Sequence, residues 1–105
     1  MDREAIIWAA GLFEGEGCFF SKKAPHNMYP SAALSMSDED SVNHFQRAVG
    51  IGKVNGPYIR GTSKPLWTWQ VHGFEKVQAV VAMLYPWLGA RRQERAKEVL
   101  AAAAY

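Results

Sequence analysis

The nine residues AAGLFEGEG, at positions 9–17, decide the fold of this chain. They end an apolar run that follows Asp2, and an aspartate before such a run is a typical helix N-cap. We therefore predict a helix over residues 4–15, which Gly15 and Gly17 end. Residues 14–17, at its C-terminal end, are two acids alternating with two glycines.

The predicted helix is apolar on both sides. One side holds Ile7, Trp8, Gly11 and Gly15, and the other holds Ala5, Ile6, Ala9, Leu12 and Phe13. A helix that is apolar all round has to be buried all round, and glycines four residues apart let a second helix approach closely. The sequence therefore predicts a homodimer around a twofold axis. The alternative is that both glycines pack against the C-terminal helix of the same chain.

Glu14 and Glu16 lie at the C-terminal end of this helix, where the helix dipole disfavours carboxylates. In a twofold dimer, two such ends would bring several carboxylate and carbonyl oxygens together. A divalent cation such as Mg²⁺ takes oxygen ligands of this kind, so we predict a metal site there. Solvated acids, or acids paired with arginine, are the alternative.

The remaining elements follow from hydrophobic periodicity and turn residues. Strands are predicted over residues 18–23, 31–37, 53–60 and 66–72, and further helices over 39–49, 74–84 and 90–104. This order predicts an α+β fold in one domain over residues 1–105, α-β-β-α-β-β-α, with a four-stranded antiparallel sheet covered by helices on one face. The aromatic residues predicted in the core include Trp67, Trp69, Phe74 and Trp87.

The charges are unevenly distributed, although 12 Lys and Arg against 10 Asp and Glu leave a net charge of only +2. Residues 17–37 and 41–74 contain no acid. The uncovered face of the predicted sheet carries cations and hydrogen-bonding side chains, namely Lys22, Ser35, Ser37, Lys53, Asn55, Thr68 and Gln70. Such a face suits the base edges and phosphates of DNA. Lysines that only keep a sheet soluble are the alternative.

Composition narrows the class of protein. With 49% hydrophobic and 21% charged residues, the chain resembles ordinary globular domains. The single cysteine, Cys18, excludes an internal disulfide and fits a reducing compartment, so we expect an intracellular protein. The longest apolar run is too short for a bilayer, so no membrane partner is expected. No dinucleotide fingerprint is present, and we expect no small-molecule cofactor.

Residues 9–17 resemble the LAGLIDADG motif of a homing endonuclease family, and the predicted order of elements is also that family's. Ala10, Gly11, Leu12 and Gly17 match the motif in kind, and two glutamates stand where the family has acids, usually aspartate. A chain with one motif is similar to the homodimeric subclass. The resemblance therefore implies a metal-dependent DNA endonuclease of intron or intein mobility that acts on pseudo-palindromic double-stranded DNA.

The resemblance also implies roles for individual residues. Glu16 would bind the catalytic Mg²⁺ or another divalent cation, with the Gly15 carbonyl as a further ligand. Asp38 would order active-site water, and Arg91, with Arg92 next in rank, would supply the basic residue. Glu14 would serve the helix pair. From the acid-free segment we also expect DNA contacts by Arg60, at the end of the predicted third strand, and by Lys64, in the loop that follows it.

Two other functions fit the same residues. A DNA-binding regulator or intron-splicing factor of this fold would keep the sheet face and lose catalysis. A small protein-binding domain would use the basic face for solubility alone, and would have no affinity for DNA even at low salt.

Overall fold

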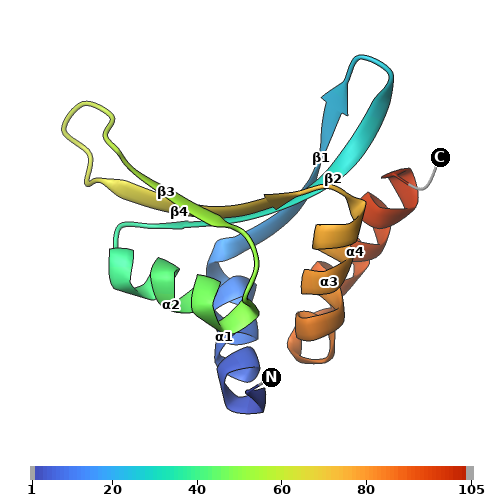
Figure 1. The fold of residues 1–105 in the computed structure, drawn as a ribbon, viewed down its shortest axis with the longest axis horizontal. Helices are drawn as coiled ribbons and strands as arrows, with labels where there is room; N and C mark the ends of the chain where they lie inside the picture. Colours follow the sequence, from blue (N-terminus) through green and yellow to red (C-terminus); the bar gives the residue numbers. More distant parts are fainter. Residues whose placement is uncertain (1, 104–105) are drawn as a thin grey trace.

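The computed structural model describes residues 2–103, and its elements follow the predicted order (Figure 1). They are α1 (Arg3–Glu16), β1 (Gly17–Ala24), β2 (Asn27–Met36), α2 (Glu39–Val49), β3 (Lys53–Tyr58), β4 (Leu66–His72), α3 (Phe74–Leu84), the 3₁₀ turn η1 (Tyr85–Trp87) and α4 (Ala90–Ala103). Ala104, predicted as the end of the last helix, lies outside the described residues. Within them, no helix is both long enough and apolar enough to cross a membrane.

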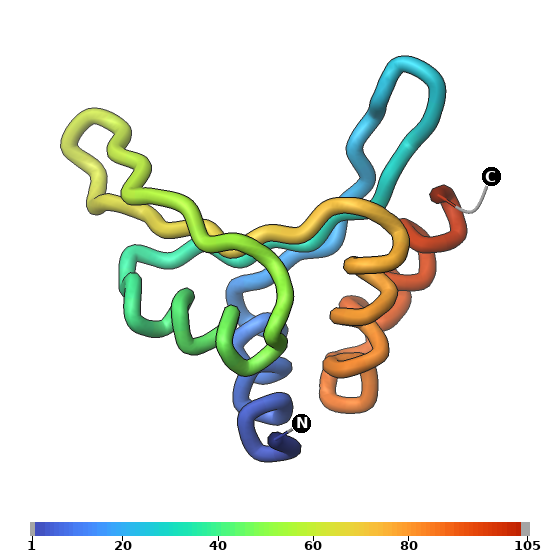
Figure 2. The backbone as a smooth tube through the Cα atoms, in the orientation of Figure 1, coloured from blue at the N-terminus to red at the C-terminus, as the bar shows by residue number. Residues whose placement is uncertain are grey.

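The strands form one antiparallel sheet in the order β1-β2-β4-β3, as the α+β prediction requires. All helices lie on one face of this sheet (Figure 1). The β1–β2 and β3–β4 hairpins curve away from the helices at opposite ends of the molecule, so the uncovered face lies between them (Figure 2). We call this uncovered surface the free face.

The helix α1 begins and ends as the motif predicts. The Asp2 carboxylate accepts hydrogen bonds from the backbone N–H groups of Glu4, at 3.0 Å, and Ala5, at 3.3 Å. At the other end, Gly17 donates its N–H to the carbonyl of Phe13. A Cβ at position 17 would overlap the Phe13 ring, so only glycine allows the chain to turn into β1 this closely over the core.

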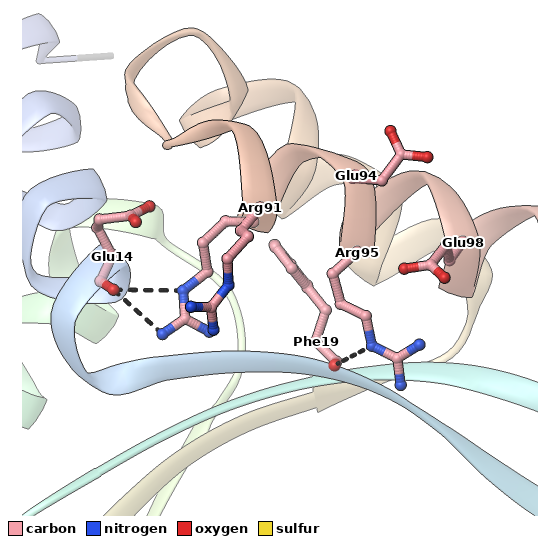
Figure 3. Close-up of a pocket in the computed structure, with 7 residues that line it drawn as sticks. Glu14, Phe19, Arg91, Glu94, Arg95 and Glu98 are labelled. Atoms are coloured by element: carbon pink, nitrogen blue, oxygen red, sulfur yellow. Dashed lines mark hydrogen bonds between the residues drawn. The ribbon is translucent and has the colours of Figure 1, made fainter.

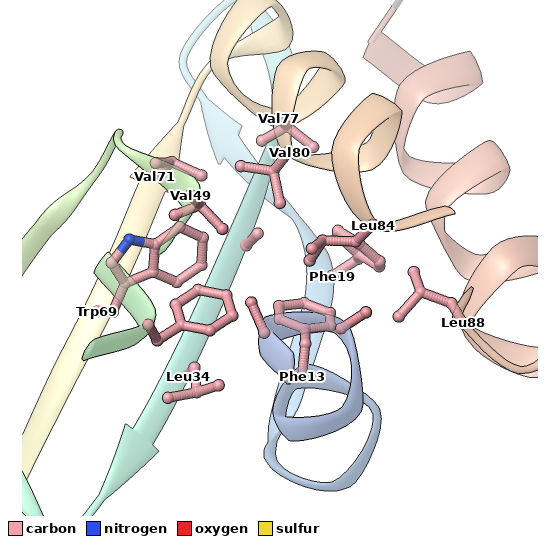
Figure 4. Close-up of a cluster of buried hydrophobic side chains, with 14 of the residues drawn as sticks. Phe13, Phe19, Leu34, Val49, Trp69, Val71, Val77, Val80, Leu84 and Leu88 are labelled. Carbon is pink, nitrogen blue, oxygen red and sulfur yellow. The ribbon is translucent and has the colours of Figure 1, made fainter. Parts of the chain in front are cut away.

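Aromatic side chains from α1, α2 and the sheet meet in the core (Figure 4). The ring centroid of Phe13 lies 4.7 Å from that of Phe19, and the Phe45 and Trp69 rings meet edge to face, also at 4.7 Å. The indole of Trp69 donates to the carbonyl of Ile51 at 2.9 Å, which satisfies the one polar atom of a fully buried side chain.

Some sequence predictions were wrong in detail. β2 starts at Asn27 and not at Ser31, because the hairpin turn is tighter than the Pro-containing loop indicated. β3 ends at Tyr58, before Arg60. Phe74 and Trp87, expected in the core, are 38% and 39% exposed because they lie at the start of α3 and in η1, at the margin of the helix layer.

Replacing Gly17 by alanine tests the contact with Phe13. Because the ring is fully buried, it cannot move aside freely, and we expect a loss of about 1–3 kcal/mol in the free energy of unfolding, as overpacking typically costs. Urea unfolding measures this. Cys18→Ala changes the exposed neighbour and should stay within about 0.5 kcal/mol of the wild type. An unaltered Gly17→Ala protein would contradict the packing argument.

Candidate functional site

The acidic end of α1 meets the beginning of α4. The Glu14 carboxylate accepts a hydrogen bond from the N–H of Gly89, at 2.9 Å, just before α4 starts. Its backbone carbonyl accepts two more from Arg92, at 3.3 Å and 3.1 Å (Figure 3). The carboxylate therefore sits at the positive end of a second helix dipole, which offsets its unfavourable place on its own helix. Glu14, predicted to serve the helix pair, has these partners within its own chain.

Beside this junction lies an open cleft of about 650 Å³ between α1, β1 and α4 (Figure 3). Arg91, Arg92 and Arg95 line it from α4. The Arg95 side chain donates to the carbonyl of Phe19 at 3.3 Å, on the edge strand of the sheet. Arg91, the first choice from the sequence for the basic residue, is exposed in the cleft. Arg92, the second choice, donates its hydrogen bonds to the Glu14 carbonyl near the end of α1.

Glu16 is the exposed acid at the last position of α1. The Gly15 carbonyl lies in the same last turn, where helical carbonyls lack intrahelical donors. These oxygen donors are of the type that Mg²⁺ prefers, so they fit the expected metal in kind. They are too few to hold it alone, since residues 2–103 contain no group of three or more His, Cys, Asp or Glu arranged to hold a metal ion.

Asp38, predicted to order water, is the N-cap of α2. Its carboxylate accepts from the Asp40 N–H at 3.2 Å and from the Ser41 hydroxyl at 2.8 Å. Because Gly17 pairs with Leu34 in the antiparallel β1–β2 ladder, Asp38 follows β2 at the same end of this strand pair at which α1 enters β1. The Asp38 side chain therefore caps α2, in addition to any catalytic role.

The glycine side of α1 is open in this chain. Within residues 2–103, a Cβ added to Gly11 or Gly15 would meet no atom outside the nearby α1 backbone within 4 Å, so the alternative that these glycines pack against the C-terminal helix was wrong. On the same side, Ile7 is partly buried and Trp8 is 37% exposed. The Trp8 indole stacks on His44 of α2 with 3.8 Å between ring centroids.

The strand register gathers most of the predicted DNA contacts on the free face. Lys53 pairs with Gln70, while Thr68 lies between Asn55 on β3 and Ser35 on β2. The Ser35 and Thr68 hydroxyls are hydrogen-bonded at 2.7 Å. These side chains alternate with the buried Trp69 and Val71, so β4 is divided between core and free face, as predicted.

The other predicted contacts lie around this group. Lys22 belongs to the β1–β2 hairpin, and it pairs with Tyr29. Arg60 and Lys64 are exposed in the β3–β4 loop. Ser37, predicted as a strand residue, follows the end of β2 at Met36 and lies in the connection to α2, because Asp38 already caps that helix.

Sequence reasoning missed a buried polar pair on the free face. The Ser31 hydroxyl is fully buried and is hydrogen-bonded to His72 Nδ1 at 2.8 Å, and the Tyr29 ring meets the His72 ring edge-on. Burial, together with the positive charges of Lys22 and Lys76, lowers the pKa of His72. No local sequence pattern predicts this pair, since its two residues are 41 positions apart.

This lowered pKa gives a test by NMR titration. His72 should titrate below its ordinary value of about 6.5, and stability should fall as the pH drops below that value, because the unfolded chain binds the proton more tightly. Lys22→Gln should raise the pKa. Lys23→Gln should not, because Lys23 pairs with Met28 and points to the opposite face. Equal shifts in both variants would refute the assignment.

Comparison with known proteins shows which solved structures share this fold. No protein-family model matches the chain, and no curated protein matches it in sequence. Solved structures do match: the homing endonuclease I-CvuI, in complex with its target in the presence of Ca, superposes with a TM-score of 0.76 at 19% identity, over 94% of this chain and 65% of that chain. The LAGLIDADG meganuclease I-AabMI, bound to uncleaved DNA, matches with a TM-score of 0.67 at 14% identity, over 89% of this chain and 33% of that one.

This chain has the LAGLIDADG homing-endonuclease fold. The homing endonuclease I-TnaI gives the same result, with a TM-score of 0.66 at 16% identity, over 94% of this chain and 69% of that one. The chain thus spans 65% of the length of the I-CvuI chain. These likenesses concern the fold, the four-stranded antiparallel sheet with helices on one face.

Proposed function

We propose that this chain is one half of a homodimeric DNA endonuclease that uses a divalent metal to hydrolyse both strands of a pseudo-palindromic site inside the cell. The observation that carries the proposal is the C-terminal end of α1. There an exposed acid, Glu16, adjoins Gly11 and Gly15, where an added Cβ would meet no other element of residues 2–103 within 4 Å. The fold and the DNA complexes of I-CvuI and I-AabMI support it.

A second copy would complete the uncovered side of α1. Gly11 and Gly15 leave room for another helix backbone, and Ile7 and Trp8 would flank that contact. A twofold axis through this contact would bring two Glu16 side chains and two Gly15 carbonyls to one place. The two copies would then supply four oxygen-bearing groups for the cation, whereas one chain supplies only two.

The free face is the proposed DNA-binding surface. It carries Lys53, Asn55, Thr68 and Gln70 in paired register, and no acid occurs between residues 41 and 74. The protein extends 40 Å along its longest axis, which is close to the roughly 34–36 Å of one turn of B-DNA. Each protomer would therefore cover about one turn, and two protomers would cover a two-part site.

Residues at the end of α1, in the cleft and at the start of α2 would share the work of phosphodiester hydrolysis. Glu16 and the Gly15 carbonyl would hold the cation, which when bound would supply Lewis acidity at the scissile phosphate. Arg91, exposed in the cleft beside α1, would balance the charge that develops on the phosphate. Arginine is a poor proton acceptor, so it would serve as an electrostatic partner and not as a base. Asp38 would orient water with the carboxylate lone pairs that its cap leaves free.

Glu16→Gln tests the endonuclease proposal. The amide keeps the shape of the side chain but removes its charge, so Mg²⁺-dependent cleavage of the DNA that flanks the protein's gene should fall by at least about a hundredfold while binding persists. Glu4→Gln is the matched control, because it removes an exposed acid from the opposite end of α1. Full cleavage by Glu16→Gln would refute the role of Glu16. DNA binding without cleavage by the wild type would favour the regulator or splicing factor instead.

Gly11→Ala separates the dimer from the fold. In one chain the added methyl group meets nothing, and alanine favours a helix by about 1 kcal/mol over glycine, so the single chain should not lose stability. Across a close helix pair, the same methyl group should weaken the dimer, and Gly11→Leu should weaken it more. Sedimentation velocity measures both, with Ala101→Leu on the exposed side of α4 as the control. A monomeric wild type that cuts both strands would contradict the proposal.

A further inference from the structure

The free face ends in an apolar group at the tip of the β3–β4 hairpin. Tyr58, Ile59 and Leu66 are 53%, 65% and 43% exposed, the highest values among the exposed large hydrophobic side chains. We call these three residues the apolar tip. They lie outside the hydrophobic core of residues 2–103.

The strand register places Tyr58 and Leu66 of the apolar tip on the same face as the polar residues of the free face, and Ile59 follows them in the loop. Leu66 lies two residues before Thr68 on β4, so both point to the free face. Tyr58 is paired with Leu66, although it lies three residues after Asn55. The extra residue of the bulge between Asn55 and Tyr58 returns Tyr58 to this face, where regular alternation would have turned it away.

The surroundings of the apolar tip indicate a negatively charged partner. Arg60 and Lys64 stand in the same loop, and the whole segment from residue 41 to residue 74 lacks acids. Asn55 and Thr68 continue the same face toward the middle of the sheet. The partner must therefore combine negative charge with apolar groups beside hydrogen-bonding edges. The major groove of DNA does so, because the C5-methyl group of thymine lies there beside base edges and phosphates.

We infer that the apolar tip contacts thymine C5-methyl groups at one end of the DNA segment that each protomer covers. The inference rests on the proposed function and adds a sequence preference to it. The hairpin lies at one extremity of the molecule, so the preference falls at an end of the segment and not at its centre (Figure 1). The polar residues of the free face would read the neighbouring base pairs by hydrogen bonds.

Removal of single methyl groups from the DNA tests this inference. A binding site is first selected from random DNA with the purified protein, and each dT is then replaced by dU, which keeps base pairing and lacks only the C5-methyl group. One or more replacements at an end of the half-site should weaken binding by about fourfold each, the equivalent of exposing one buried methylene. Replacements elsewhere should have a smaller effect.

Protein variants identify the side chains. In Tyr58→Thr/Leu66→Thr, binding to the dT site should weaken and dU replacement at the same end should have no further effect. Threonine suits exposed strand positions, and thermal unfolding verifies the fold. Met28→Thr, an exposed apolar residue of the other hairpin, should keep the full response to dU.

The outcomes distinguish the apolar-tip contact with thymine from DNA binding itself. Wild-type binding that ignores dU at both ends, a selected site without thymine there, or a dU response that survives in the double variant overturns the apolar-tip contact and leaves DNA binding intact. A protein that binds no DNA at low salt overturns the contact together with the proposed function.

Discussion

The close approach of Gly17 to the Phe13 ring is the constraint on which the rest of the structure depends. It lets α1 pass directly into β1 while the ring stays fully buried between α1 and the sheet. From there Phe13 contacts Phe19 on β1, and its ring lies 6.1 Å from Phe45 of α2. The Arg92 guanidinium lies 5.9 Å from the same ring and reaches the end of α1 from α4. One helix-to-strand turn thereby fixes the sheet, α2 and α4 relative to the acidic helix end.

The two acids of residues 9–17 have different environments in spite of their similar chemistry. Glu14 is engaged by the start of α4 through both its carboxylate and its carbonyl, whereas Glu16 lies exposed in the last turn of α1. One acid therefore joins two helices of the chain, and the other is available to a ligand. The contact with Gly89 explains how a helix end that should avoid negative charge tolerates Glu14.

Local patterns predicted most of the fold, because they report local physics. The Asp2 cap, the helix of residues 39–49 and the alternation in β4 each depend on neighbours within a few residues. The Glu14 contact with Gly89 and the Ser31–His72 pair span 75 and 41 positions, so no local signal predicts them. Phe74 was misplaced in the core for a related reason, because helical spacing shows a stripe but not where the layer beneath it ends.

The strict alternation of β4 separates two kinds of evolutionary constraint. Trp69 and Val71 face the core, where a change in volume affects the whole domain, whereas Thr68 and Gln70 are only partly buried on the free face. Thr68 and Gln70 can therefore change with less effect on the core, whereas His72, on the same face, is held by its hydrogen bond to the buried Ser31. Single substitutions on the free face can therefore give the chain a new recognition surface. Each of them leaves the packing of the core, and with it most of the stability, almost unchanged.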